Sequence, residues 1–445
     1  MTTYISSNRN AACGGSWRAA LLKISRWRPV FRLPFFLFLL YLPHHASAQD
    51  SGKGAAPARE MPTAVQADPF GFRSKAERIK ALEKYGGDAS TEDAVLKALR
   101  WFKSIQNPDG SWGMSYRSGI TGIVLLAFLG HGETPMSEEF GKSVSGSIAY
   151  LEKQFAANGG SFVQKNFGNE GYEHAIATFA VCEAYGMTRD PKLYPVMNGA
   201  VKRVIEGQRG EGGWDYRYGE SARRDLSVGG WNMQALNAAR SASADAPSIQ
   251  EAMRKAVKDT KKHWDKSTGM FTYSNETAPG RPTLTGVGAL CVIELDGTDS
   301  AEFKGAMRYL VKNARIDWRQ MQPYSIYSWY YQTLTFFKSE QNWKNWNPQM
   351  KKELVENQDD DGHWEESVGG RPSNDQEMDV LNTALCCLML EVYYRYFTVS
   401  VEKERGGGGS SATKGGEVDD EAPLSTGRSS EKPPEGKIEY KGIPY

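Results

Sequence analysis

Six polar or ionisable residues occupy equivalent positions, one helical turn before the start of six apolar segments that repeat along the chain. They are Arg117, His174, Asp225, Arg281, Tyr324 and Asp379. If the segments are helices that lie side by side, we expect these six side chains to face the axis at one end of the bundle. There Asp225, His174 and Asp379 are candidates for a general acid or base. Arg117 and Arg281 are candidates to hold an anionic ligand such as a diphosphate or a carboxylate.

Aromatic residues are concentrated beside this ring, at Tyr172, Trp231, Tyr327, Trp329, Tyr330 and Tyr331. A cavity lined by aromatic faces stabilises carbocations by cation–π attraction, and it equally suits an isoprenoid or a sugar ring. Trp231 and Tyr327 therefore join Arg117, Arg281 and Tyr324 as candidate ligand-binding residues. In the alternative interpretation the aromatic residues fill the interior, and the ring is a girdle of salt bridges in which Asp225 and Asp379 are helix N-caps.

Histidine and cysteine positions argue against a metal centre. Zinc needs three or four converging ligands, and His174 is the one histidine expected at the start of an inner helix. No Cys-x-x-Cys pair occurs, and the cysteines after Cys13 lie inside apolar segments. Arg117 and Arg281 in the same ring would oppose a cation. The sequence predicts no metal and no cofactor, and it has no clustered basic helix, so we expect no nucleic-acid partner.

The elements that must position these residues are two alternating sets of helices. The apolar set begins at small residues, namely Thr121, Thr178, Gly229, Thr285, Ser328 and Thr383. Amphipathic segments lie between them, at residues 91–106, 139–155, 192–208, 249–264, 301–314 and 348–358. A repeat of roughly fifty residues with two helices per unit predicts an all-α (α/α)6 toroid, in which six apolar helices form an inner ring and six amphipathic helices an outer ring.

A Gln-x-x-x-Gly-x-Trp turn joins outer to inner helices in three of the repeats. The copies run from Gln106 to Trp112, from Gln208 to Trp214 and from Gln358 to Trp364. These turns resemble the glutamine–tryptophan repeats of squalene cyclases, and the inner helices resemble the barrel of the wider terpenoid-cyclase and protein-prenyltransferase superfamily. The resemblance covers nearly all of the central region. It implies a structural role for these residues, in which the glutamine caps an outer helix and the tryptophan stacks on it.

The catalytic motifs of that superfamily are missing. Neither Asp-x-Asp-Asp nor Asp-Asp-x-x-Asp is present, and Ala289 and Asn382 stand where the zinc site of the prenyltransferases would place ligands beside Cys291. Fold alone does not license function, so two hypotheses remain. The first is a non-catalytic binding or scaffold module for a hydrophobic or polymeric ligand (an isoprenoid or other lipid, a saccharide) or for a protein partner. The alternative is a divergent terpenoid-cyclase-type enzyme that uses an unrecognised acid at the barrel mouth.

The two ends of the chain differ from the central region. Residues 1–48 predict a signal peptide, since a basic stretch precedes an apolar run at residues 33–42 and then Ala46-Ser47-Ala48. We therefore expect a periplasmic or secreted protein, with an uncleaved membrane anchor as the alternative and no other membrane contact. Residues 49–69 predict a flexible lead, residues 70–398 the toroid, and residues 399–445 a disordered tail rich in glycine and charge.

Overall fold

The computed structural model describes residues 70, 73–165, 168–219, 223–244, 246–274, 279–368, 371–372 and 375–396. The predicted signal peptide, lead and C-terminal tail lie outside these described residues. Among the described helices, none combines the length and apolar content that a membrane span requires.

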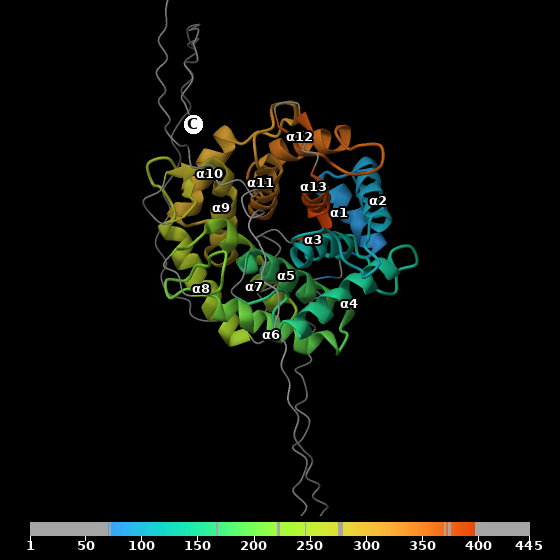
Figure 1. Cartoon of the computed structure of the whole chain (residues 1–445). Helices are drawn as coiled ribbons and strands as arrows, with labels where there is room; N and C mark the ends of the chain where they lie inside the picture. Colours follow the sequence, from blue (N-terminus) through green and yellow to red (C-terminus); the bar gives the residue numbers. More distant parts are fainter. Residues whose placement is uncertain are drawn as a thin grey trace, which may run out of the picture. The chain divides into compact units, whose positions relative to one another are not determined.

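Six buried helices form the inner ring of the described region. They are α3 (Arg117–Gly130), α5 (Glu170–Thr188), α7 (Leu226–Ser241), α9 (Pro282–Asp296), α11 (Ser325–Ser339) and α13 (Gln376–Leu390). Each packs against the next, and α13 packs against α3, which closes the ring (Figure 1). Since all six run in the same direction, their N-terminal ends share one mouth of the barrel and their C-terminal ends share the other.

Six amphipathic helices surround this ring. They are α2 (Ala89–Ser104), α4 (Gly141–Ala157), α6 (Leu193–Glu206), α8 (Ala246–Lys262), α10 (Ala301–Asn313) and α12 (Trp343–Glu356). Along α3 every residue from Ser118 to Gly130 is buried, whereas α2 buries one face. The predicted all-α (α/α)6 toroid is confirmed. Helix α12 begins five residues before the predicted start at Pro348, because Trp346 in its first turn is buried in the core.

Several short elements were not predicted from the repeat. Helices α1 (Lys75–Tyr85) and α14 (Val392–Arg395) pack on each other, and α14 directly follows the C-terminal end of α13. The η2 turn (Trp318–Gln320) precedes α11. Two antiparallel pairs of two-residue strands, β1 (Phe271–Thr272) with β2 (Gly280–Arg281) and β3 (Ser367–Val368) with β4 (Arg371–Pro372), precede α9 and α13. The short strands and the η2 turn lie in connections between helices and leave the helical architecture unchanged.

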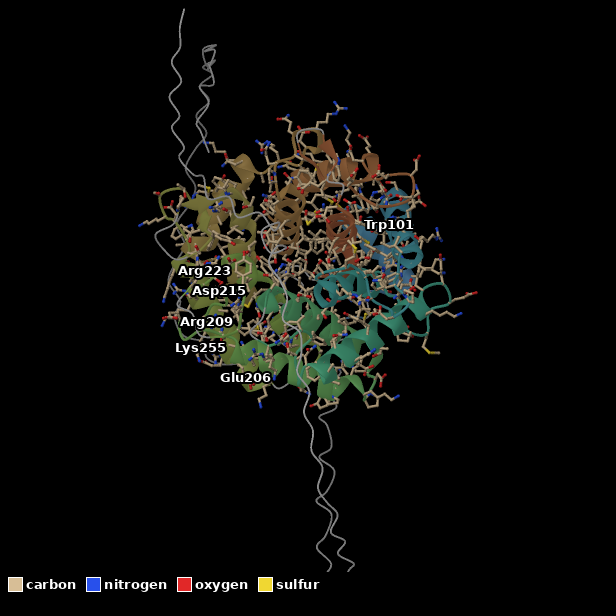
Figure 2. All side chains as sticks on the ribbon, viewed as in Figure 1. Trp101, Glu206, Arg209, Asp215, Arg223 and Lys255 are labelled. Carbon is tan, nitrogen blue, oxygen red and sulfur yellow. The ribbon has the colours of Figure 1, made fainter. Side chains whose placement is uncertain are left out.

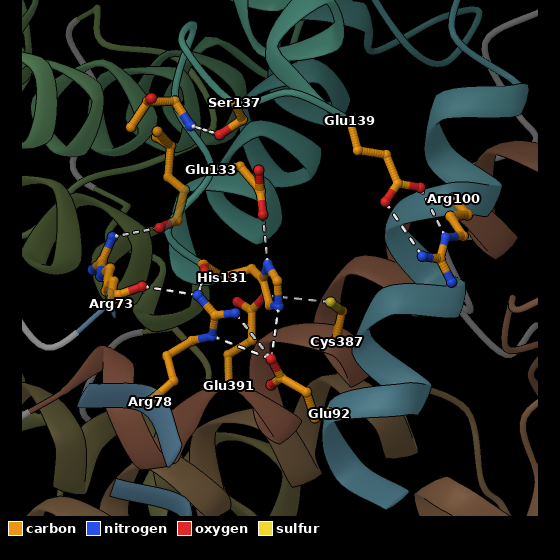
Figure 3. A network of polar contacts seen from close by, with 12 residues as sticks. Arg73, Arg78, Glu92, Arg100, His131, Glu133, Ser137, Glu139, Cys387 and Glu391 are labelled. Carbon is orange, nitrogen blue, oxygen red and sulfur yellow. Dashed lines mark hydrogen bonds and ion pairs between the residues drawn. The ribbon is translucent and has the colours of Figure 1, made fainter. Parts of the chain in front are cut away.

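A buried polar network attaches α1 to the barrel. Arg78 of α1 donates to Glu92 Oε1 of α2 through Nε at 3.2 Å and through Nη2 at 3.0 Å, and to the carbonyl of His131 after α3 at 2.7 Å. The His131 ring lies between the carboxylates of Glu92 and Glu133 (Figure 3). Burial opposes its charge, but the two carboxylates raise the pKa of His131 above its ordinary value. This network holds the N-terminal helix of the described region in place.

Glutamine side chains of the Gln-Trp turns join neighbouring outer helices. The Nε2 of Gln358 donates to the carbonyl of Gly362 in its own turn at 2.9 Å and to the carbonyl of Ala94 in α2 at 2.8 Å. Because Gln358 follows α12, this bond closes the outer ring. Gln106 and Gln208 make the equivalent pairs of bonds, which reach α4 and α8.

The tryptophans of these turns are buried against the helices that precede them. Trp112, Trp214 and Trp364 are at most 1 % exposed. Each indole Nε1 donates at 2.8 Å to a backbone carbonyl of the preceding outer helix. Two observations explain the turn glycine. Gly110 has a φ of 89°, which favours glycine, and a Cβ there would lie 2.2 Å from the carbonyl oxygen of Gly146. Backbone geometry and packing together determine this motif.

Candidate functional site

The six predicted ring residues do not share one environment. Arg117, the first residue of α3, pairs with Asp109 of the preceding turn at 2.6 Å, and its guanidinium lies 5.3 Å from the ring centre of Tyr150 in α4. It is therefore directed toward the outer ring, and the predicted axial orientation is wrong for Arg117. Arg117 and Thr121 lie one turn apart in α3 and both contact the preceding turn, so the helical phase was right but this face of α3 points to the outer ring.

His174 lies inside the wall of the barrel, fully buried between α5 and α6. Its Nδ1 accepts from the backbone N–H of Phe162 at 3.2 Å, and its Nε2 donates to the carbonyl of Ala200 at 3.0 Å. In three other repeats a threonine hydroxyl accepts the corresponding N–H, as Thr121 does from Trp112. Burial lowers the pKa of His174 to about 4, so the ring is neutral at pH 7. Its predicted place at a pocket mouth is corrected.

The start of α13 also differs from the prediction. Asp375, not Asp379, is the N-cap, since its carboxylate accepts from the backbone N–H groups of Glu377 and Met378. Asp379 lies in the first turn of the helix. Sequence reasoning missed Glu377, whose Oε1 accepts from three consecutive backbone N–H groups that lead into α3, including that of Tyr116 at 2.9 Å. A glutamate two residues before the expected Asp379 therefore joins α13 to the segment that leads into α3.

Asp225 is the N-cap of α7, as the alternative interpretation of the ring predicted. Its Oδ1 accepts from the N–H groups of Ser227 at 3.0 Å and Val228 at 3.3 Å, and Arg223 Nη2 donates to its Oδ2 at 2.6 Å. The carboxylate is fully buried, whereas the side chain of Arg223 is 35 % exposed. A buried negative charge at the N-terminal mouth is thus covered by a cation that reaches solvent.

Tyrosine rings surround this ion pair. The guanidinium of Arg223 lies 4.9 Å from the ring centre of Tyr216 and 5.5 Å from that of Tyr273. The two tyrosine hydroxyls are 2.5 Å apart, and Arg281 before α9 lies 5.5 Å from the Tyr273 ring centre. Tyr172 of α5 adds a ring 5.4 Å from Tyr216, and its hydroxyl bonds with that of Ser227. We call Tyr172, Tyr216, Arg223, Asp225, Tyr273 and Arg281 the tyrosine–arginine cluster.

The cluster gathers residues from α5, from the turn before α7, and from the segments around β1 and β2. Figure 2 shows Arg223 and Asp215 on one side of the ring, opposite Trp101 of α2. Asp215 accepts a second bond from Arg223. Tyr324, a ligand-binding candidate, precedes α11 with a φ of 68° and is 52 % exposed. Of the predicted ring, the structure joins Asp225 and Arg281 in one site and leaves Arg117 and His174 elsewhere.

Electrostatic interactions favour the charged form of Arg223 and the protonated forms of the Tyr172 and Tyr273 phenols. Burial opposes the charge on Arg223, but Asp225 and Asp215 outweigh it and raise the pKa of the guanidinium above its ordinary value. Burial, then the negative charge of Asp225, raises the pKa of the Tyr172 and Tyr273 phenols. Tyr172 and Tyr273 therefore present neutral hydroxyls at pH 7. These groups can both donate and accept hydrogen bonds to a ligand.

Glu173, next to Tyr172 on α5, adds a titratable carboxyl at the same mouth. Burial raises its pKa to about 7, the backbone N–H groups of Gly119 and Ser118 lower it, and the charge of Glu377 raises it. Its Oε2 accepts from the Gly119 N–H at 3.4 Å. Glu173 is thus a described acid of the N-terminal mouth that exchanges its proton near neutral pH, and no sequence motif singles it out. Glu366 is a second one, since burial raises its pKa to about 7 beside the backbone N–H groups of Ser325 and Tyr324 at the start of α11.

Beneath the mouth, aromatic side chains fill the barrel. Trp231 is 2 % exposed and stacks on Tyr330 with ring centres 5.7 Å apart, and Tyr331 packs against both. Gln234 accepts from the Tyr330 hydroxyl and donates to that of Tyr331. Trp231 is therefore part of the core. Tyr327, a candidate ligand-binding residue, packs on Tyr331 and is half-buried, so it is more exposed than the rings of Trp231, Tyr330 and Tyr331.

Metal-ligating side chains do not converge in the described region. No group of three or more histidine, cysteine, aspartate or glutamate side chains there is arranged to hold an ion. Cys182, Cys291, Cys386 and Cys387 are buried and unpaired. The structure gives no observation that places a cofactor, and the prediction that none is bound stays a prediction.

Comparison with known proteins supports the fold. No protein-family model and no curated protein sequence matches this chain. Among solved structures, it is similar to the GH76A α-1,6-mannanase from Salegentibacter sp. HEL1_6, with a TM-score of 0.52 and 13% identity over 68% of this chain and 98% of that one. An inactive variant of that mannanase in complex with α-1,6-mannotriose gives a TM-score of 0.51 and 12% identity over 68% and 99% of the two chains. At such identities the likeness shows a shared α/α toroid and no more.

Proposed function

We propose that this protein binds a saccharide at the N-terminal mouth of its toroid, through the tyrosine–arginine cluster. The observation that carries the proposal is the half-exposed stack of Tyr216, Arg223 and Tyr273 over the buried carboxylate of Asp225. Sugar rings offer C–H faces that pack on aromatic rings and hydroxyls that bond to charged groups and phenols. The cluster combines both kinds of group. The mannanase likeness supports a saccharide ligand as compatible with this fold.

The other partners considered from sequence fit this mouth less well. An isoprenoid needs a large apolar surface, but the aromatic interior beneath the cluster is filled by Trp231, Tyr330 and Tyr331. The exposed groups above it are a guanidinium and phenol edges. A protein partner would need a large contact surface, and the described residues of this mouth show no feature that indicates one. We therefore restrict the proposal to a saccharide.

An enzyme that uses an acid at this mouth is the second candidate function. Glu173, with its pKa raised to about 7, favours it, because a carboxyl that is protonated near neutrality can donate a proton to a leaving group. Asp225, held by Arg223 and the α7 N-terminus, provides a second carboxylate of different environment. Glycoside hydrolysis uses an acid together with a second carboxylate, and a terpenoid-cyclase-type reaction would also need a buried acid. In this candidate Glu173 replaces His174 and Asp379 as the acid.

Titration calorimetry with neutral oligosaccharides, α-1,6-mannotetraose among them, tests the binding proposal. Tyr273→Ala should weaken binding by about tenfold, the loss expected for about 1.4 kcal/mol of stacking. Tyr194→Ala is the matched control, since Tyr194 is a 47 % exposed tyrosine at the start of α6, beside Tyr185 near the C-terminal end of α5 and thus at the opposite mouth. Equal affinities for the two variants, or no binding by any oligosaccharide of the panel, would refute the proposal.

Release of reducing ends from the oligosaccharide that binds separates the two candidates. Turnover by the wild type that is lost in Glu173→Gln, with binding retained, would establish the enzyme. Binding without turnover would leave the protein as a saccharide-binding module. Turnover that persists in Glu173→Gln would rule out Glu173 as the acid.

We also propose that the protein acts outside the cytoplasm, as a periplasmic or secreted chain. This proposal rests on the predicted signal peptide at residues 1–48. Extracellular polysaccharide would be accessible to such a protein.

A further inference from the structure

A second site lies at the opposite mouth, where the inner helices end. A cavity of about 70 Å³, in part open to solvent, is lined there by residues of α5, α7, α9, α11 and α14. Its wall combines apolar side chains, such as Phe179 and Leu290, with charged ones that are almost fully buried. No predicted site residue lies in it, and the tyrosine–arginine cluster contributes nothing to it.

The charges in the cavity wall do not cancel. Glu183 is shared by two arginines, with Arg73 Nη1 at 2.8 Å from one carboxylate oxygen and Arg395 Nη2 at 3.1 Å from the other. Lys338 pairs with Glu294 at 2.7 Å. Three cations thus face two carboxylates, and their side chains are at most 6 % exposed. Counted over the described residues, the cavity wall carries a surplus of one positive charge.

Glu391, behind Arg395 on the same short segment, does not remove this surplus. It is fully buried and accepts from the Cys387 thiol at 3.5 Å (Figure 3). Burial raises its pKa to about 8, although Arg395, His131 and Arg73 lower it, so this carboxyl is largely neutral at pH 7. The charge of Arg395 is therefore balanced by Glu183, which it shares with Arg73.

Arg395 has hydrogen-bonding capacity that the described residues leave unused. Its side chain is fully buried, yet Nε and Nη1 have no hydrogen-bond partner there. The guanidinium lies 5.2 Å from the ring centre of Phe179 and 5.1 Å from that of Tyr396. Buried donors of a charged group are costly to leave unpaired. An acceptor that enters the cavity and carries negative charge would satisfy them.

We propose that this cavity binds a small monocarboxylate, with the carboxylate on Arg395 and an apolar body against Phe179 and Leu290. A single negative charge matches the surplus of the wall. A dianion would not, because the C-terminal ends of α5, α7, α9 and α11 bring partial negative charge to the same mouth. The site is independent of saccharide binding at the other mouth, so either proposal stands if the other fails.

Ligand chemistry provides the first test, on the full wild-type chain. We expect benzoate to raise the melting temperature and to bind in calorimetry at least about tenfold more tightly than the neutral isostere benzamide, and more tightly than phenyl phosphate at pH 7.5. Equal binding of benzoate and benzamide would show an apolar pocket without charge recognition. Absence of benzoate binding would show that water satisfies Arg395. Either result would overturn the proposal.

Two variants locate the site without removing the arginine. Ala238 of α7 lines the cavity and is 7 % exposed, so Ala238→Leu should fill the space and weaken benzoate at least about tenfold. Glu294→Gln preserves shape but adds one net positive charge, so it should improve phenyl phosphate about tenfold relative to benzoate. Circular dichroism checks that each variant is folded. If folded Ala238→Leu binds benzoate as the wild type does, the ligand lies elsewhere and the proposal fails.

Discussion

Removing the indole of Trp214 tests whether the Gln-Trp turns hold the outer ring together. Trp214 is 1 % exposed, and its Nε1 donates to the carbonyl of Val204 in α6 at 2.8 Å. Trp214→Ala removes a packed aromatic side chain, which costs about 3–5 kcal/mol of unfolding free energy when the site cannot collapse. Trp214→Phe keeps most of the ring but leaves the Val204 carbonyl without its donor, which costs about 1–3 kcal/mol.

Urea unfolding followed by circular dichroism at 222 nm measures both changes. Trp318→Ala is the matched control, since Trp318 is half-buried on η2 and outside any Gln-Trp turn. We expect it to cost less than half as much as Trp214→Ala, because less apolar area leaves the core. If Trp214→Ala costs no more than Trp318→Ala, the turn does not hold the ring. If Trp214→Phe costs as much as Trp214→Ala, the hydrogen bond and not packing stabilises it.

Four further predictions follow from the site residues and the chain termini. Because the folded pKa of His174, about 4, lies below its ordinary 6.5, the folded state resists protonation. The free energy of unfolding should therefore fall by up to about 3 kcal/mol from pH 6.5 to 4. In urea unfolding, His174→Gln should reduce this dependence on pH, and an unchanged dependence would contradict the prediction. Asp225→Ala should cost about 1–2 kcal/mol of cap energy and Asp225→Asn less, since the amide oxygen still accepts from Ser227; equal losses contradict capping. N-terminal sequencing of the native protein should begin near Gln49, and a start at Met1 would exclude signal cleavage. Elemental analysis should find no stoichiometric zinc, and about one zinc per chain would revive a prenyltransferase-like site.

The repeat was enough to predict the architecture. Apolar and amphipathic segments alternate in phase, and a helix that is apolar all round must be covered on every side, so an inner and an outer ring follow. The Gln-Trp turns could also be recognised, because their glycines are required by a backbone conformation that depends on residues close in sequence. Helix α1 was not predicted, since it belongs to no repeat and is held by Arg78 through contacts with distant segments.

Side-chain directions at the barrel mouth could not be predicted in the same way. Helical phase fixes which residues share a face of a helix, but not whether that face points to the axis or to the outer ring. For Arg117 and His174 the preceding turns decide it. The cluster around Arg223 joins segments that are far apart in sequence, so no spacing reveals it. The same holds for the cavity at Arg395. The sequence by itself determined the ring of helices, because periodicity is a local property; the tertiary structure decided both sites, because burial, charge pairing and pKa depend on residues that only folding brings together.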